Sequence, residues 1–250
     1  MPKPLKTHFL PPRSGTIGPD DIAVVTDILR ASSVIVAALA AGAKCVRPFL
    51  EIEEAIEAAS HDAAPLLCGE RTGIKVPGFD LGNSPGDFTS ERCRGRTAFM
   101  TTTNGTRAIL AATSAKLVKI LAFTNMTATV KSLRNFDGTV HLVCSGTDGY
   151  VSWEDTLACG MAADLLESSG FEASDDTTRI AMSAYRHELD GMNITDPDFR
   201  RKLGQVLRKG RGGRRVREIG LEKDIDEVAR LDDFAILSHV EADPWRIVAS

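Results

Sequence analysis

The sequence predicts an α/β fold built around a mainly parallel sheet. Short apolar runs rich in β-branched residues alternate with helix-like stretches through the first half of the 250-residue chain, a pattern typical of such sheets. Hydrophobic residues make up 43% of the chain and charged residues 26%, as in ordinary soluble globular proteins. Polar residues follow the expected strands, where open α/β sheets bind their ligands. We therefore expect a single domain over residues 1–250, of which about 178–220 could form a basic helical subdomain or lid.

The first half of the chain supplies most of the expected elements. Strands are predicted where apolar runs are bounded by turn residues, at 22–25, 45–49, 65–68, 97–100, 117–123 and 140–144. Helices are predicted between and after them, at 32–41, 53–59, 106–113, 127–133 and 154–168. Acidic Glu53 and Glu54 at the start of one helix suit the positive end of its dipole. The segment 69–89 contains five glycines and two prolines, so we expect a long functional loop there.

The chain after Gly170 has a different character. Helical segments are expected from about 181 and over 198–207, a last amphipathic helix over 225–231 and a last strand at 234–237. Between them, the segment 209–215 reads KGRGGRR and is predicted to be a glycine-rich basic hinge. This segment raises the hypothesis of nucleic-acid binding. The net charge of −4 and the lack of a recognisable binding motif instead favour a basic lid or a solvated surface.

Composition excludes several other classes of protein. No window reaches the roughly 18 apolar residues that a membrane helix needs, and the N-terminus lacks the apolar core of a signal peptide. The five cysteines are scattered without a CxxC pair, so neither a zinc knuckle nor a disulfide framework is expected. We expect a cytoplasmic protein with a small polyanionic substrate as its partner and with neither nucleic-acid nor membrane partners. A homodimer is compatible with the sequence.

The segment 101–107, TTTNGTR, is the most informative part of the chain. It lies between an apolar run and a helix-like run, where free backbone N–H groups and the helix dipole favour an anion. Arg107 could add a bidentate contact to the same anion. We interpret the segment as a phosphate cradle. The alternative is a strand-to-helix turn whose threonines merely cap the helix.

Similar polar sets follow the other expected strands, so we expect them to converge on one pocket. The pocket would contain Arg30, Arg71 and Arg107 together with several carboxylates: Asp27, Glu70, Glu154 and Asp155. Arginine binds oxyanions in a bidentate manner, and carboxylate oxygens hold Mg²⁺. The combination predicts a polyanionic substrate and a divalent cation. The alternative is that each Asp–Arg pair braces its own loop and each hydroxyl caps a helix.

The common phosphatase nucleophiles do not fit the spacing of the sequence. A cysteine phosphatase needs an arginine six positions after its cysteine, but Tyr150 follows Cys144 there and Ile74 follows Cys68. An aspartyl-phosphate enzyme of the haloacid dehalogenase type needs a second Asp two residues on, but Leu29 follows Asp27 at that distance. By elimination, the nucleophile is predicted to be a metal-bound hydroxide, with direct attack by Asp27 as the alternative.

Six segments, in this order, resemble the 2-phosphosulfolactate phosphatase family (ComB-like proteins). They are DILRASS (27–33), GERTG (69–73), PGFDLGNSP (77–85), TTTNGTR (101–107), SGT (145–147) and SWEDT (152–156). Residues near Asp224 and Asp232 resemble the C-terminal end of the family, so the resemblance extends from about residue 20 to 248. It implies a three-layer α/β/α fold and a Mg²⁺-dependent phosphatase. The family reaction converts 2-phospho-3-sulfolactate to 3-sulfolactate and phosphate, a step towards coenzyme M.

The resemblance and the strand-end residues together define the candidate site. The catalytic candidates are Asp27, Arg30, Arg107 and Glu154, and the Mg²⁺ ligands are expected among Asp27, Glu70, Glu154 and Asp155. The substrate-binding candidates are Ser32, Arg71, Asn83, Ser84, Thr102, Thr103, Asn104, Gly105, Thr106, Gly146 and Thr147. Within this set, the 101–107 turn and Arg30 would neutralise the phosphoryl group. Arg71, Asn83 and Ser84 would bind the carboxylate or sulfonate.

Two other functional classes remain open at this point. A non-catalytic anion- or nucleotide-binding module would use the amides and arginines but would leave the carboxylates without a role. A phosphotransferase should depend on a nucleotide, yet the sequence has no nucleotide fingerprint. Within the phosphatase hypothesis, the substrate could also be a different phospho-acid.

Overall fold

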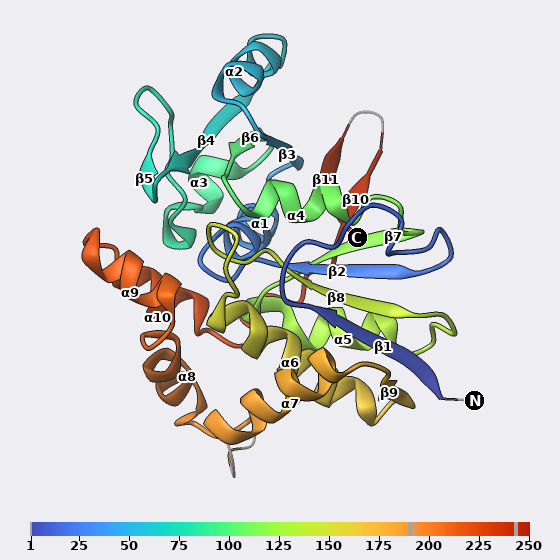
Figure 1. Ribbon diagram of the computed structural model, residues 1–250. Coiled ribbons are helices and arrows are strands. Elements are labelled where there is room, and N and C mark those ends of the chain that lie inside the picture. Colours follow the sequence, from blue (N-terminus) through green and yellow to red (C-terminus); the bar gives the residue numbers. More distant parts are fainter. Residues whose placement is uncertain (1, 190–191, 193, 243–244) are drawn as a thin grey trace.

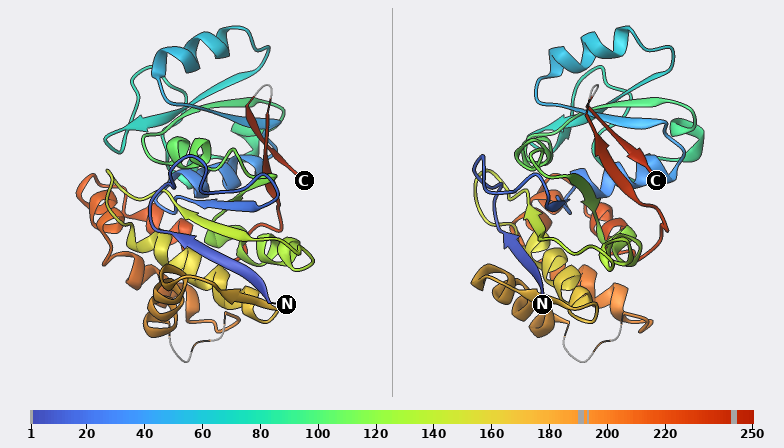
Figure 2. Two further views of the ribbon diagram at one scale, coloured as in Figure 1. Left: turned by 45° about the vertical axis from the view of Figure 1, so that its right-hand side comes forward. Right: turned by 90° about the vertical axis from the view of Figure 1, so that its right-hand side faces the viewer.

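The computed structural model describes residues 2–189, 192, 194–242 and 245–250. Within these residues, eleven strands form one sheet. Figures 1 and 2 show how the strands and helices are arranged. Its strands, from one edge to the other, are β5 (Ile74–Lys75), β4 (Pro65–Arg71), β6 (Thr97–Thr101), β3 (Cys45–Phe49), β11 (Arg246–Ala249), β10 (Ser238–Glu241), β7 (Leu117–Leu121), β2 (Ile22–Thr26), β8 (Val140–Cys144), β1 (Lys3–His8) and β9 (Phe171–Ala173).

The sheet consists of two parallel groups joined by a hairpin. Strands β4, β6 and β3 are parallel, and so are β7, β2, β8, β1 and β9. The antiparallel hairpin β10–β11 lies between the groups and contacts β7 and β3. The carboxyl ends of β2 and β8 lie at the same edge of the sheet because Thr26 pairs with Cys144.

Helices cover both faces of the sheet and complete three layers. The helices are α1 (Ala31–Ala40), α2 (Ile52–Ser60), α3 (Ser90–Cys93), α4 (Gly105–Ala111), α5 (Met126–Leu133), α6 (Trp153–Glu167), α7 (Asp176–Glu188), α8 (Phe199–Leu207), α9 (Arg211–Glu218) and α10 (Lys223–Val228), with 3₁₀ turns η1 (Pro85–Asp87) and η2 (Phe123–Asn125). Along β2, Val24 packs with α5 and α6, whereas Ala23 and Val25 pack with α1 and α4. This alternation is what a strand buried on both faces requires. It confirms the predicted α/β/α architecture.

Two expectations for the second half of the chain were wrong. The segment 209–215 is not a hinge, because residues from Arg211 onward form α9. Its glycines serve close packing: a Cβ on Gly212 would collide with the Glu154 carboxylate, and one on Gly213 would collide with the Leu207 carbonyl. The predicted strand at 234–237 is irregular, and the strand begins at Ser238.

The long loop predicted over 69–89 in the first half of the chain is also shorter than expected, because β4 continues to Arg71 and β5 follows. None of the helices in the described ranges has the length and apolarity to cross a membrane.

Candidate functional site

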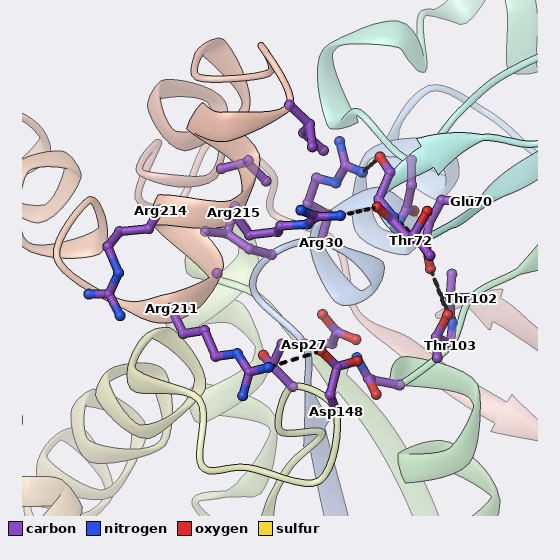
Figure 3. Close-up of a pocket in the computed structure, with 18 of the residues that line it drawn as sticks. Asp27, Arg30, Glu70, Thr72, Thr102, Thr103, Asp148, Arg211, Arg214 and Arg215 are labelled. Carbon is purple, nitrogen blue, oxygen red and sulfur yellow. Dashed lines mark hydrogen bonds and ion pairs between the residues drawn. The ribbon is translucent and has the colours of Figure 1, made fainter.

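A pocket of about 490 Å³ lies where the carboxyl ends of four strands meet α9 (Figure 3). Its walls come from the segments after β2, β4, β6 and β8, and α9 closes the opposite side. The lining residues are Asp27, Leu29, Arg30, Glu70, Thr72, Gly73, Asn83, Thr102, Thr103, Asn104, Thr147, Asp148, Arg211, Gly212, Arg214, Arg215, Val216, Glu218 and Ile219. The structure therefore brings together strand-end residues that are far apart in the sequence.

Asp27 is buried at the base of the pocket, directly after β2. Its Oδ1 accepts a hydrogen bond from the Ala31 N–H at 3.3 Å, and its own N–H donates to Ser32 Oγ at 2.8 Å. Gly105 allows α4 to approach this carboxylate, because a Cβ there would lie 2.9 Å from Asp27 Oδ2 and 2.5 Å from the Ala31 Cβ. Ser32 and Gly105 thus position Asp27.

Asp155 is buried close to Asp27 but is fully engaged by hydrogen bonds. Its Oδ1 accepts from the Ile28 N–H at 2.8 Å, and its Oδ2 accepts from Ser145 Oγ at 3.0 Å and the Gly146 N–H at 3.2 Å. The Asp155 N–H is capped in turn by Ser152 Oγ. Asp155 therefore joins the segments that follow β2 and β8, and it is not part of the pocket wall.

Glu154, on the first turn of α6, is 1% exposed and lies beneath α9. The Gly212 N–H hydrogen-bonds to its carboxylate, yet its Oε2 has no hydrogen-bond partner among the residues that the structure describes. Buried polar atoms of this kind are rare without a bound partner. Glu154 therefore has an oxygen available to a cation.

Burial and mutual repulsion raise the pKa of these three carboxyls. Burial is the main cause for each, followed by the charge of Asp155 acting on Asp27, and of Glu154 acting on Asp155. The pKa of Glu154 rises to about 7, through burial and then the charge of Asp27. Clustered carboxyls with raised pKa values are common at functional sites, and a cation would relieve their repulsion.

The 101–107 turn already holds an anion, the carboxylate of Glu70. Its Oε1 accepts from the Thr103 N–H and Oγ1, both at 3.2 Å, and its Oε2 accepts from the Gly73 N–H at 2.6 Å. Thr102 Oγ1 caps the Thr106 N–H at 3.3 Å. Thr102, Thr103 and Asn104 line the pocket, but part of the predicted phosphate cradle is used within the protein.

The three predicted arginines do not lie together. Arg30 lines the pocket and is buried, with Nη1 at 2.6 Å from Asp224 Oδ2 and Nη2 at 2.6 Å from the Gly73 carbonyl. Arg71 instead donates to the carbonyls of Glu70 and Leu50. Arg107 is exposed and is not part of the pocket wall. It follows Gly105 by two residues, which is about 200° around a helix, so it points away from the face that meets Asp27.

The remaining predicted residues occupy different positions around the pocket. Asn83 lines it, is buried, and has an Oδ1 without a partner in the described part of the chain. Ser84 bonds Asp224 at 3.0 Å and Arg30 at 3.3 Å, so it supports the ion pair. Thr147 lines the pocket, whereas Gly146 is buried behind it and donates to Asp155.

Sequence reasoning missed the contributions of α9 and α10. Arg211, Arg214 and Arg215 of α9 line the pocket, and Asp224 of α10 neutralises Arg30. The basic composition of 208–217 was a visible signal, but the hinge interpretation placed these arginines on flexible chain. The resemblance to the family included residues near Asp224, but the pairing of Asp224 with Arg30 could not be predicted, because the two residues lie 194 positions apart.

No group of three or more His, Cys, Asp and Glu side chains forms a metal site within the described residues. Mg²⁺, however, is commonly held by one or two carboxylates together with waters and substrate phosphate. Asp27 lines the pocket, and Glu154 lies outside the pocket wall but keeps Oε2 without a hydrogen-bond partner in the described residues, whereas both oxygens of Glu70 and of Asp155 accept hydrogen bonds.

The sequence matches the family model described as 2-phosphosulpholactate phosphatase over residues 11–243. Several relatives carry the name "Probable 2-phosphosulfolactate phosphatase". The protein from Caldanaerobacter subterraneus is 36% identical over 86% of this chain and 85% of its own length. That from Thermosynechococcus vestitus is 34% identical over 96% and 95%, and that from Deinococcus radiodurans is 36% identical over 87% and 86%.

Proposed function

Because the chain belongs to the 2-phosphosulfolactate phosphatase family and is a phosphoric monoester hydrolase, we propose that it hydrolyses 2-phospho-3-sulfolactate. The products would be 3-sulfolactate and phosphate, and a related small phospho-hydroxyacid is the alternative substrate. One observation carries the proposal. A single pocket combines the buried Asp27 carboxylate with the arginines of α9, next to Glu154. A polyanionic substrate needs both cationic side chains and a site for a counter-ion.

Asp27 and Glu154 would hold Mg²⁺. The supporting observations are the unpartnered Glu154 Oε2 in the described part of the chain, and the repulsion between the two carboxyls. When bound, the ion would supply positive charge to the phosphoryl oxygens and lower the pKa of a water molecule. The Asp27 carboxylate would keep its hydrogen bonds with the Ala31 N–H and the Ser145 hydroxyl while it holds the ion.

The chain itself positions the substrate and encloses it. Thr102, Asn104 and Thr147 line the pocket near the strand ends and supply donors for phosphoryl oxygens. The Arg30–Asp224 ion pair holds the Gly73 turn in place through the 2.6 Å bond to its carbonyl. The α9 helix covers Glu154 and limits the access of water to that carboxylate, which strengthens electrostatic interactions in the site.

We propose that water rather than Asp27 attacks phosphorus, since the Asp27 carboxylate is engaged by the Ala31 N–H and would also hold the cation. Direct attack by water should invert the configuration of a phosphoryl group made chiral with oxygen isotopes, and should leave no phosphorylated protein. Retention of configuration, with an aspartyl phosphate trapped on the Asp27 peptide by borohydride reduction and found by mass spectrometry, would instead identify Asp27 as the nucleophile.

A phosphate-release assay tests the function directly. The substrates are 2-phospho-3-sulfolactate, 2-phospholactate and 2-phosphoglycerate, each with Mg²⁺ or with EDTA. We expect release to be fastest from 2-phospho-3-sulfolactate and to be abolished by EDTA. A faster reaction of another acid would identify a different substrate, and equal rates with EDTA would remove the role of Mg²⁺. No release from any acid, with ligand still bound, would indicate a binding module.

A further inference from the structure

Helix α9 presents two arginines to the pocket from one of its faces. Arg211 and Arg215 are four residues apart, and residues at this spacing are neighbours on a helix surface. Figure 3 shows Arg215 extending towards Thr72 and Arg211 towards Asp148, on opposite sides of the pocket, whereas Arg214 points away from both. The helix therefore places two guanidinium groups over the pocket.

Both arginines have exposed partners that a ligand can replace. Arg215 donates to the Thr72 carbonyl at 3.1 Å and lies 3.9 Å from Glu218. Arg211 lies 3.2 Å from Asp148 Oδ2 and stacks over the Tyr150 ring. Exposed ion pairs of this kind contribute little to stability. Arg30 differs, because its charge is neutralised by buried Asp224 and removing that pairing would leave a buried charge.

The helix that carries these arginines is held firmly in place. Gly210 and Gly212 lie directly against the Glu154 carboxylate, and Gly213 lies against the Leu207 carbonyl. Val216, on the same helix, is buried. Arg211 and Arg215 therefore project from a fixed element, and a rigid support favours selective binding of a ligand group.

We propose that Arg211 and Arg215 bind the sulfonate group of the substrate and so determine specificity among phospho-hydroxyacids. This proposal rests on the proposed function. With the phosphoryl group at Asp27, at the carboxyl end of β2, the other end of the substrate would face the α9 arginines on the opposite side of the pocket. The planar guanidinium group donates paired hydrogen bonds to an oxyanion. A sulfonate has three oxygens and can accept hydrogen bonds from both arginines once Arg215 has left the Thr72 carbonyl and Arg211 has left Asp148.

The kinetic test compares 2-phospho-3-sulfolactate with 2-phospholactate, which lacks the sulfonate. In Arg211→Gln and Arg215→Gln, the ratio of kcat/KM for the two substrates should fall by about 10- to 100-fold, mainly through KM, as for the loss of a charged hydrogen bond. Arg215→Lys keeps the charge but not the paired donors, and should lose most of the same preference. Arg217→Gln is the matched control on α9, because Arg217 pairs with Glu222 outside the pocket wall.

Direct binding of 3-sulfolactate, measured by calorimetry, keeps this proposal separate from the proposed function. The two glutamine variants should bind it about 10- to 100-fold more weakly than the wild type, and Arg217→Gln should bind it normally. Equal loss of activity towards both substrates would overturn the proposal, as would unchanged affinity for 3-sulfolactate or no binding by the wild type. Failure of phosphate release alone would overturn only the proposed function.

Discussion

The carboxyls Asp27 and Asp155 are similar in chemistry and both are buried, but their surroundings give them different tasks. Asp155 accepts three hydrogen bonds that join the segments after β2 and β8. Asp27 has hydrogen bonds with the Ala31 N–H and the Ser145 hydroxyl, and it lines the pocket, which Asp155 does not. Asp155 therefore serves to join two segments of the fold, whereas Asp27 faces the space that a ligand would occupy.

Asparagine substitutions should separate these two tasks. Asp27→Asn should lower kcat by at least about 10²-fold, by analogy with the loss of a group that stabilises the transition state, and should not lower stability. In Asp155→Asn, the amide NH₂ must face the N–H of either Ile28 or Gly146, which should lower the free energy of unfolding by about 1–3 kcal/mol. Phosphate release and urea unfolding of both variants measure the difference. Equal losses of stability would contradict the assignment.

Gly105 is needed because α4 approaches Asp27 too closely for a side chain. Gly105→Ala would place a Cβ 2.5 Å from the Ala31 Cβ and 2.9 Å from Asp27 Oδ2. We expect the carboxylate to shift and kcat to fall by about 10²-fold, as for a misplaced catalytic group. Gly86→Ala is the control, because the Cβ added there meets Glu227 only at 3.6 Å. Equal activity of the two variants would show that the close approach does not matter.

Helix α9 shows that a glycine-rich segment can indicate either a flexible hinge or a closely packed helix. Glycine breaks helices through its backbone entropy, and this property favoured a hinge at 209–215. In the structure, Gly212 and Gly213 lie inside or at the start of a helix because they touch Glu154 and Leu207. Close packing therefore outweighs the low helix propensity of glycine, an effect that depends on the tertiary partner.

Gly212→Ala tests whether this packing fixes α9. The added methyl group would collide with the Glu154 carboxylate, so α9 should move away from α6. We expect faster amide hydrogen exchange across 211–218 and a loss of phosphate release, with exchange in α1 unchanged. Alanine is the better helix former, so an effect of propensity alone would slow exchange in α9. Arg217→Ala is the control, since its exposed side chain pairs with Glu222.

In the molecule as a whole, the features that sequence patterns predicted correctly are those set by residues close together in the chain. The apolar runs 22–25 and 140–144 gave strands, and the polar segments after them meet at one edge because parallel strands share a direction. The strand Lys3–His8, which lies between β8 and β9, was missed, since its lysines and proline hide the β pattern. The hairpin β10–β11 was also missed, because only the tertiary fold places it between β3 and β7.

In the candidate site, too, local sequence patterns predicted some features, whereas contacts between distant segments were not predicted. Sequence predicted the pocket residues that follow strands, including Asp27, Glu70 and Thr102. The sequence could not predict which of these side chains would form hydrogen bonds or ion pairs with other parts of the protein. Glu70 is taken by Thr103 and Gly73, and Arg30 by Asp224. These contacts depend on side-chain geometry between distant segments, and no spacing in the chain encodes them.

A pair of histidines joins two parallel strands of the sheet and makes stability depend on pH. His8 on β1 and His141 on β8 stack with ring centroids 5.2 Å apart, and His8 Nε2 lies 2.9 Å from His141 Nδ1. Burial lowers the pKa of both, that of His8 to about 4, and their mutual repulsion adds to the effect on His8. Since unfolding would restore a pKa near 6.5, the unfolded chain binds more protons between about pH 6.5 and 4.

The stability contributed by neutral His8 should therefore be complete above pH 6.5 and decline as the pH falls towards 4. His8→Gln removes the titrating group, so the wild type should lose more unfolding free energy than this variant between pH 7 and 5. Urea unfolding at several pH values measures the difference. The raised pKa values of Asp27, Glu154 and Asp155 act in the opposite direction, but they are common to both proteins and cancel in the comparison. His61→Gln, at an exposed position, is the control. Parallel curves for the wild type and His8→Gln would mean that the histidine stack does not link stability to pH.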